Sequence, residues 1–128
     1  MQVEPPTPDA AARQVCSRLV PALPSHLDAA TRRVTRPTDP LTVAWGEPPL
    51  VLRCGVERPA GLSPTSEILE VEGVEWFLVE SDAGFTFTTV GRTASVELLV
   101  PASVDWSAAT APLVDLAAAI TRHNRATR

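Results

Sequence analysis

The sequence contains no lysine and no tyrosine, and only three tryptophans and three phenylalanines occur in 128 residues. A platform that stacks single-stranded nucleic acid needs several exposed aromatic side chains among basic residues. The six aromatics here lie mostly within apolar strand patterns, so we exclude that class of protein. The formal net charge of −4 also argues against a general binder of nucleic acid or anionic membranes. No run of 18 apolar residues is present, so no segment has the composition of a membrane-spanning helix.

Residue patterns of known catalytic chemistry are also missing. The six glycines are scattered singly, which excludes a glycine-rich phosphate loop, and no G-x-S-x-G motif occurs. Two cysteines and two distant histidines offer no pair of metal ligands at a suitable spacing. Six acidic residues and no base lie between positions 67 and 82, but their alternation with apolar residues fits a solvated sheet face better than a catalytic pair. We therefore expect no metal and no cofactor, and we favour a non-catalytic protein over an enzyme.

The composition is that of one packed domain, with 45% apolar and 20% charged residues. Residues 1–8 hold three prolines and no periodicity, which predicts a flexible linker, and residues 9–128 form the single domain. A chain that starts just after a removed signal or membrane anchor would begin in this way. A plain flexible N-terminus is the alternative.

Helical periodicity occurs near both ends of the chain. The first helix is predicted to begin at Asp9, a good N-cap residue, and to end or kink near Leu19–Val20 because Pro21 and Pro24 follow. The last helix is predicted to open near Thr110–Pro112. Its apolar stripe consists of Leu113, Leu116, Ala117 and Ile120.

Between these helices the apolar residues mostly alternate with a period of two. The pattern predicts strands at residues 41–45, 50–56, 68–71, 74–80, 85–90 and 93–100, and a short helical turn around Leu27–Val34 is the one further helical candidate. The predicted fold class is α+β. We expect a mostly antiparallel sheet of about five to six strands, with the N-terminal and C-terminal helices packed on one of its faces.

Both cysteines fall on positions predicted to face the core, Cys16 on the first helix and Cys54 on the strand over residues 50–56. A disulfide between them would close a loop of 39 residues. The chain-entropy estimate for its stabilisation is about 4 kcal/mol. The alternative is two separate buried thiols that act as small hydrophobes. A persistent disulfide implies an oxidising compartment, which in a bacterium lies beyond the cytoplasmic membrane.

The segment from Trp45 to Val56 reads Trp-Gly-Glu-Pro-Pro-Leu-Val-Leu-Arg-Cys-Gly-Val and is followed by Arg58-Pro59. It resembles a family of actinobacterial proteins of unknown function, and the resemblance extends over most of the chain. The all-arginine basic residues, with 18 Ala and 13 Pro, agree with such an origin. The resemblance implies a short envelope protein with one N-terminal membrane helix and an extracytoplasmic domain. This chain departs from that pattern because it contains no such helix.

We predict that a ligand or partner contacts Trp45, Arg53, Arg58 and Arg92, because tryptophan and arginine are enriched at binding hot spots. Each has a structural alternative. Arg53 could pair with a neighbouring acid such as Glu57, and Trp45 could be a core residue.

The functional hypothesis is a non-catalytic binding or assembly domain outside the cytoplasm, anchored to the cell membrane or secreted. Its expected partner is an envelope protein or a cell-wall component, and membrane contact is expected only through an N-terminal anchor that this chain lacks. One alternative is an enzyme that modifies envelope polymers with acids of residues 67–82, or with Arg53 and Arg92 as an anion clamp. The other is a cytosolic regulatory domain with reduced cysteines.

Overall fold

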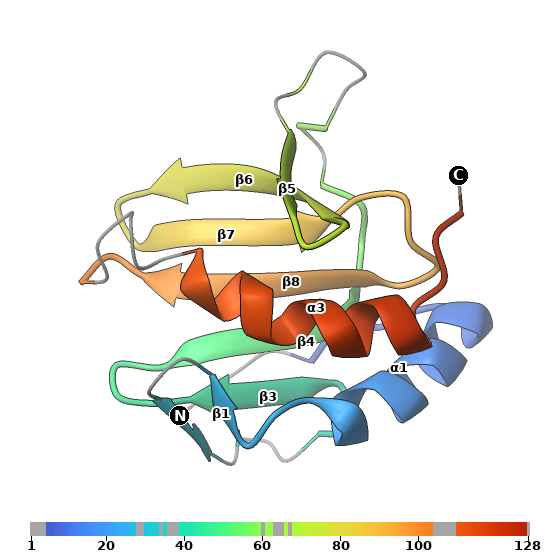
Figure 1. Ribbon diagram of the computed structural model, residues 1–128, viewed down its shortest axis with the longest axis horizontal. Coiled ribbons are helices and arrows are strands. Elements are labelled where there is room, and N and C mark those ends of the chain that lie inside the picture. Colours follow the sequence, from blue (N-terminus) through green and yellow to red (C-terminus); the bar gives the residue numbers. More distant parts are fainter. Residues whose placement is uncertain are drawn as a thin grey trace.

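One antiparallel sheet of eight strands forms the body of the protein, and two helices lie on one of its faces (Figure 1). The computed structural model describes residues 5–27, 30–33, 35, 39–59, 61–62, 66, 68–103 and 110–127. Across the sheet the strand order is β1-β2-β3-β4-β8-β7-β6-β5. The helices are α1 (Ala10–Ala22) and α3 (Ala111–His123). The strands are β1 (His26–Leu27), β2 (Ala30–Arg33), β3 (Thr42–Trp45), β4 (Leu50–Val56), β5 (Ile68–Val71), β6 (Val74–Ser81), β7 (Gly84–Thr89) and β8 (Ser95–Pro101).

The expectation of five to six strands was wrong, because two short strands extend the sheet beyond β3. In the described part of residues 27–34, β1 and β2 replace the expected helical turn. Arg32 pairs with Trp45 and Arg33 with Ala44, so β2 is held by backbone pairing to β3. Apart from Ala30, the β2 side chains are exposed, and no apolar alternation marks them in the sequence. Strand β1 pairs with the other side of β2 and forms the edge of the sheet, so both strands depend on pairing with a neighbour.

Helix α1 begins where the sequence predicts, and it ends later. The Asp9 carboxylate accepts a hydrogen bond from the Ala12 N–H at 2.8 Å, which satisfies one of the free donors of the first turn. The helix then continues to Ala22 with Pro21 in its last turn. Because few residues follow Pro21 in the helix, its missing N–H and its ring disturb only the helix end. The buried residues of α1 are Ala12, Cys16, Leu19 and Val20.

Helix α3 packs against α1 and reaches β1 at one side of the sheet and β5 and β6 at the other. Pro112 stands in its first turn, as expected from the free N–H groups there. The predicted stripe of Leu113, Leu116, Ala117 and Ile120 is buried. Neither helix of the described chain has the length and hydropathy needed to cross a membrane.

The alternation of the strands divides their side chains between two faces. The face covered by the helices holds the largest fully buried side chains of the sheet, Trp45, Leu52, Trp76, Phe87 and Leu98. On the opposite face, Gly61 of the β4–β5 connection lies close to Phe77 of β6. This connection must pass β8, β7 and β6 to reach β5, because these strands separate β4 from β5 in the sheet.

Candidate functional site

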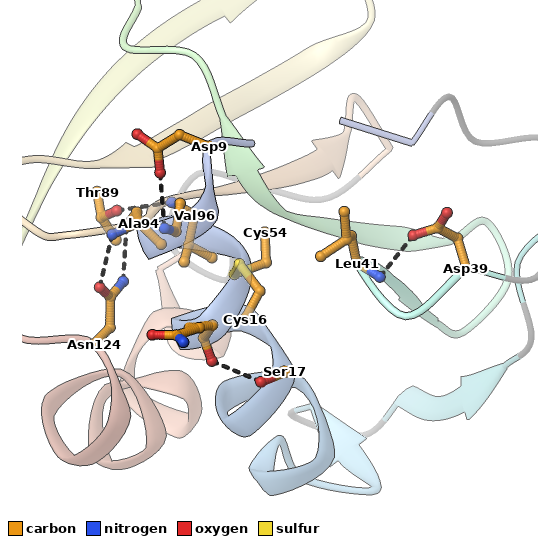
Figure 2. Close-up of a disulfide and its surroundings, with 12 residues drawn as sticks. Asp9, Cys16, Ser17, Asp39, Leu41, Cys54, Thr89, Ala94, Val96 and Asn124 are labelled. Atoms are coloured by element: carbon orange, nitrogen blue, oxygen red, sulfur yellow. Dashed lines mark hydrogen bonds between the residues drawn. A yellow bond between two sulfur atoms is a disulfide. The ribbon is translucent and has the colours of Figure 1, made fainter. Parts of the chain in front are cut away.

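The predicted disulfide is confirmed. Cys16 of α1 and Cys54 of β4 are bonded, their Cα atoms are 5.8 Å apart, and both residues are fully buried. Figure 2 shows the bond joining the helix to the sheet, with the Asp9 cap at the start of the same helix. The first helix is thus fixed covalently to a central strand, across 38 positions of sequence.

Gly55 follows Cys54 and places the N-terminal segment against β4. The pairing of β4 with β8 shifts between Cys54 and Val56, and Gly55 at this bulge has φ +94°, a conformation that favours glycine. A Cβ atom at this position would lie 2.6 Å from Cβ of Pro8, so a larger residue would clash. Cys54 and Gly55 therefore have distinct structural roles. Cys54 forms the disulfide, and Gly55 allows the close approach of Pro8.

Arg53 lies on the face opposite the helices, where it forms an ion pair. Its Nε is 2.7 Å from Oε1 of Glu97, the residue directly opposite on β8. The side chains are 26% and 13% exposed, so the pair is largely shielded from solvent. The sequence suggested Glu57 as a partner because it is close in the chain. The register of β4 and β8 selects Glu97 instead.

This ion pair belongs to a polar row that follows the strand register across the sheet. Thr42 of β3 is opposite Arg53, and Thr88 of β7 is opposite Glu97. Both threonines are buried, and the hydroxyl oxygens of Thr42 and Thr35 are 2.6 Å apart. We call Thr42, Arg53, Glu97 and Thr88 the polar row.

Trp45 lies at the end of β3 opposite to Thr42 of the polar row, and its side chain is on the other face of the sheet. It pairs with Leu50 beside the β3–β4 turn, it is fully buried, and its Nε1 donates a hydrogen bond to the Pro24 carbonyl at 3.0 Å. Trp45 is therefore a core residue, which was the structural alternative to a role in binding. Trp76 is also fully buried, and its ring meets Phe87 edge-on at a centroid distance of 6.5 Å.

Arg58 follows the end of β4 and Arg92 precedes the start of β8, so both lie at the end of the sheet opposite the β3–β4 turn. Val56 pairs with Ser95, so the segment after β4 and the loop before β8 emerge together. Arg58 is exposed. Arg92 donates from Nη1 to the Asn124 carbonyl at 3.0 Å and from Nη2 to the Gly73 carbonyl at 3.2 Å, and so joins the end of α3 to the β5–β6 turn. The structure thus brings Arg58 and Arg92 to one end, with Arg53 on a face and Trp45 at the other end.

Asn124 has a structural role that the sequence did not reveal. Its fully buried side chain accepts from the Ala94 N–H at 3.0 Å and donates to the Ala94 carbonyl at 2.7 Å (Figure 2). The following residues continue this contact, since Arg92 and Ala126 form an isolated β-bridge. An asparagine directly after a helix is a common end signal. That signal does not identify a partner 30 residues away.

The described residues contain no group of three metal-ligating side chains. A surface hollow of about 700 Å³ lies beside α3 and is lined by Glu72, Val114, Ala117, Ala118, Thr121 and Arg122. Of the six acids between positions 67 and 82, Glu72 lines this hollow, while Glu70, Glu80 and Asp82 are exposed on or beside strands. Glu67 lies outside the described residues, as does Trp106, for which we expect partial exposure.

Comparison with known proteins identifies a family. No curated protein and no solved structure matches the chain. The family model described as "Protein of unknown function (DUF3515)" matches residues 2–128, which confirms the expected kinship with a family of unknown function. The chain therefore belongs to the DUF3515 family.

Proposed function

We propose that this chain is the extracytoplasmic domain of an actinobacterial cell-envelope protein, membrane-anchored or secreted, and that it serves binding or assembly. The Cys16–Cys54 disulfide carries this proposal. Disulfides persist in oxidising compartments and are rare where thiol reductants keep cysteines reduced. The alternative of a cytosolic regulatory domain requires two separate reduced thiols, whereas these sulfur atoms are bonded in the core.

The docking surface of this proposal is the end of the sheet where Arg58 and Arg92 emerge. Arg58 is exposed, and Arg125 lies nearby because its carbonyl accepts from the Thr93 N–H at 3.0 Å. Guanidinium groups bind carboxylates and phosphates in a planar, two-pronged geometry. The partner is therefore an envelope protein or cell-wall component that presents such anions. Arg53 and Trp45 contribute indirectly, by fixing the strands that lead to this end.

Photo-crosslinking in native envelope tests the proposal. The chain has no lysine, so amine-directed crosslinkers find no side chain, and a photoreactive residue at exposed Glu57 is the suitable probe. We expect Arg58→Ala to reduce crosslinking to the envelope partner at least fivefold with an unchanged melting temperature. Arg18→Ala, an exposed arginine on α1, is the matched control and should change neither quantity. Equal crosslinking by the Arg58→Ala and Arg18→Ala variants would contradict this docking surface.

A further inference from the structure

Among the residues that the structure describes, the second half of β6 pairs with a strand on one side only. Strand β5 pairs with β6 only over Val74–Phe77, ending at the Ile68–Phe77 pair. Strand β6 continues to Ser81, and over Leu78–Ser81 its partner among the described residues is β7 alone. Figure 1 shows β5 turning steeply away from the line of β6. We call Leu78–Ser81 the β6 edge.

At alternate residues of the β6 edge, the backbone groups point away from β7. The β6–β7 hairpin closes at the Ser81–Gly84 pair with a turn of two residues. In an antiparallel ladder, successive residues alternate between bonding the partner and facing outward. The N–H and C=O groups of Leu78 and Glu80 therefore face outward, in the arrangement that an additional strand requires.

Side chains of the β6 edge leave room for such a strand. Val79 is 46% exposed. Among the described residues, the only other exposed large apolar side chain is that of Val114, at 49%. Glu80 and Ser81 are also exposed. An apolar side chain of an incoming strand can thus pack beside Val79 on the face opposite the helices.

The charges around the β6 edge select the partner. Glu80 lies on the β6 edge and Asp82 follows it in the turn to β7, and both acids are exposed. Like charges that face each other across a strand pair are unfavourable, whereas carboxylates attract cations. A second copy of this chain would bring the same acids together across the new pairing. A basic segment has the complementary charge.

We propose that the β6 edge binds an extended, basic segment of a partner chain, in which arginine or lysine alternates with apolar residues, by adding it as a further strand. This site is separate from the Arg58–Arg92 end and does not depend on the compartment of the protein. Backbone pairing supplies the geometry, Val79 an apolar contact, and the acids the preference for a basic sequence.

The test uses a blocked peptide with the sequence Arg-Val-Arg-Val-Arg and measures amide hydrogen exchange of the full chain by NMR. Saturating peptide should slow exchange of the Leu78 and Glu80 N–H groups at least tenfold. Those of Val79 and Ser81 already bond to β7 and should change less. The peptide Glu-Val-Glu-Val-Glu should bind at least tenfold more weakly. Equal binding of both peptides, or no slowing at Leu78 and Glu80, would overturn the proposal.

Matched surface variants locate the contact. Val79→Lys should weaken binding of the basic peptide at least tenfold, and Val114→Lys, a change of the same kind on α3, should leave it unchanged. Arg58→Ala should also leave it unchanged, which separates this site from the proposed docking surface. If Val79→Lys and Val114→Lys bind alike, the proposal fails. It fails too if sedimentation shows that the chain forms a dimer and that Val79→Lys dissociates this dimer.

Discussion

The two faces of the sheet are built from the same strands but differ in how they are stabilised. The face under the helices is apolar, with Leu52 and Leu98 fully buried and the Cys16–Cys54 disulfide fastening α1 to β4. The opposite face carries the polar row, centred on the Arg53–Glu97 ion pair. Burial of apolar area and a covalent link supply most of the stability, and polar pairs contribute less because their desolvation offsets much of their attraction. We therefore expect the helix-covered face to contribute most of the stability, whereas both proposed binding sites lie at an end or an edge of the sheet.

Removal of the disulfide should have the largest effect on the helix-covered face. The Cys16→Ala/Cys54→Ala double variant should lose about 4 kcal/mol of unfolding free energy, because the cross-link no longer restricts the unfolded chain. Urea unfolding followed by fluorescence of the tryptophans measures this loss. The stability of the variant should not respond to reductant, whereas wild type should fall to a similar value when reduced. Equal stability of variant and oxidised wild type would show that the bond adds nothing.

Two adjacent leucines of β8 compare the faces directly. Leu98 is fully buried under the helices and Leu99 is half-buried on the opposite face. Leu98→Ala should cost about 2–5 kcal/mol through lost burial and the cavity left behind. Leu99→Ala should cost about 1 kcal/mol, since less apolar area is lost. Similar costs in denaturant unfolding would mean that the two faces contribute equally.

The Arg53–Glu97 pair measures the contribution of the polar row. Arg53→Ala should cost about 1–3 kcal/mol, because it leaves a shielded carboxylate without its partner. In the Arg53→Ala/Glu97→Ala double variant the loss should be smaller than the sum of the two single losses, by the coupling energy of the pair. Strict additivity of the two changes would show that the ion pair contributes no stability.

Thr42→Val is expected to have an effect as small as that of Leu99→Ala. The substitution keeps the shape of a buried strand residue and removes the hydroxyl that contacts Thr35. We expect a loss of about 1 kcal/mol in thermal or urea unfolding, the usual net value of one hydrogen bond. A loss as large as that of Leu98→Ala would place this face on a par with the helix-covered core.

Local patterns predicted the elements whose stability is encoded nearby in the chain. Six strands follow apolar alternation, the Asp9 cap stands beside the turn that it satisfies, and the cysteines lie on core-facing positions of their elements. Strand β2 lacks apolar alternation and depends on pairing with β3, and the two residues of β1 pair with β2, so no local pattern indicated either strand.

Partners distant in the chain escaped prediction for a related reason. Arg53 and Glu97 are 44 residues apart, and Asn124 and Ala94 are 30 apart. Their contacts depend on strand order and register, which a periodic pattern does not contain. For the same reason the motif around Trp45–Arg58 did not reveal that its tryptophan and its arginines lie at different places in the sheet.

The state of the two cysteines in the living cell tests the central claim most directly. Cells that produce the native chain are lysed in acid, and free thiols are alkylated under denaturing conditions before any reduction. Proteolysis and mass spectrometry then report Cys16 and Cys54. We predict a peptide pair linked through Cys16 and Cys54, with both residues protected from alkylation. Alkylation of both cysteines without prior reduction would contradict the disulfide and, with it, the proposed extracytoplasmic function.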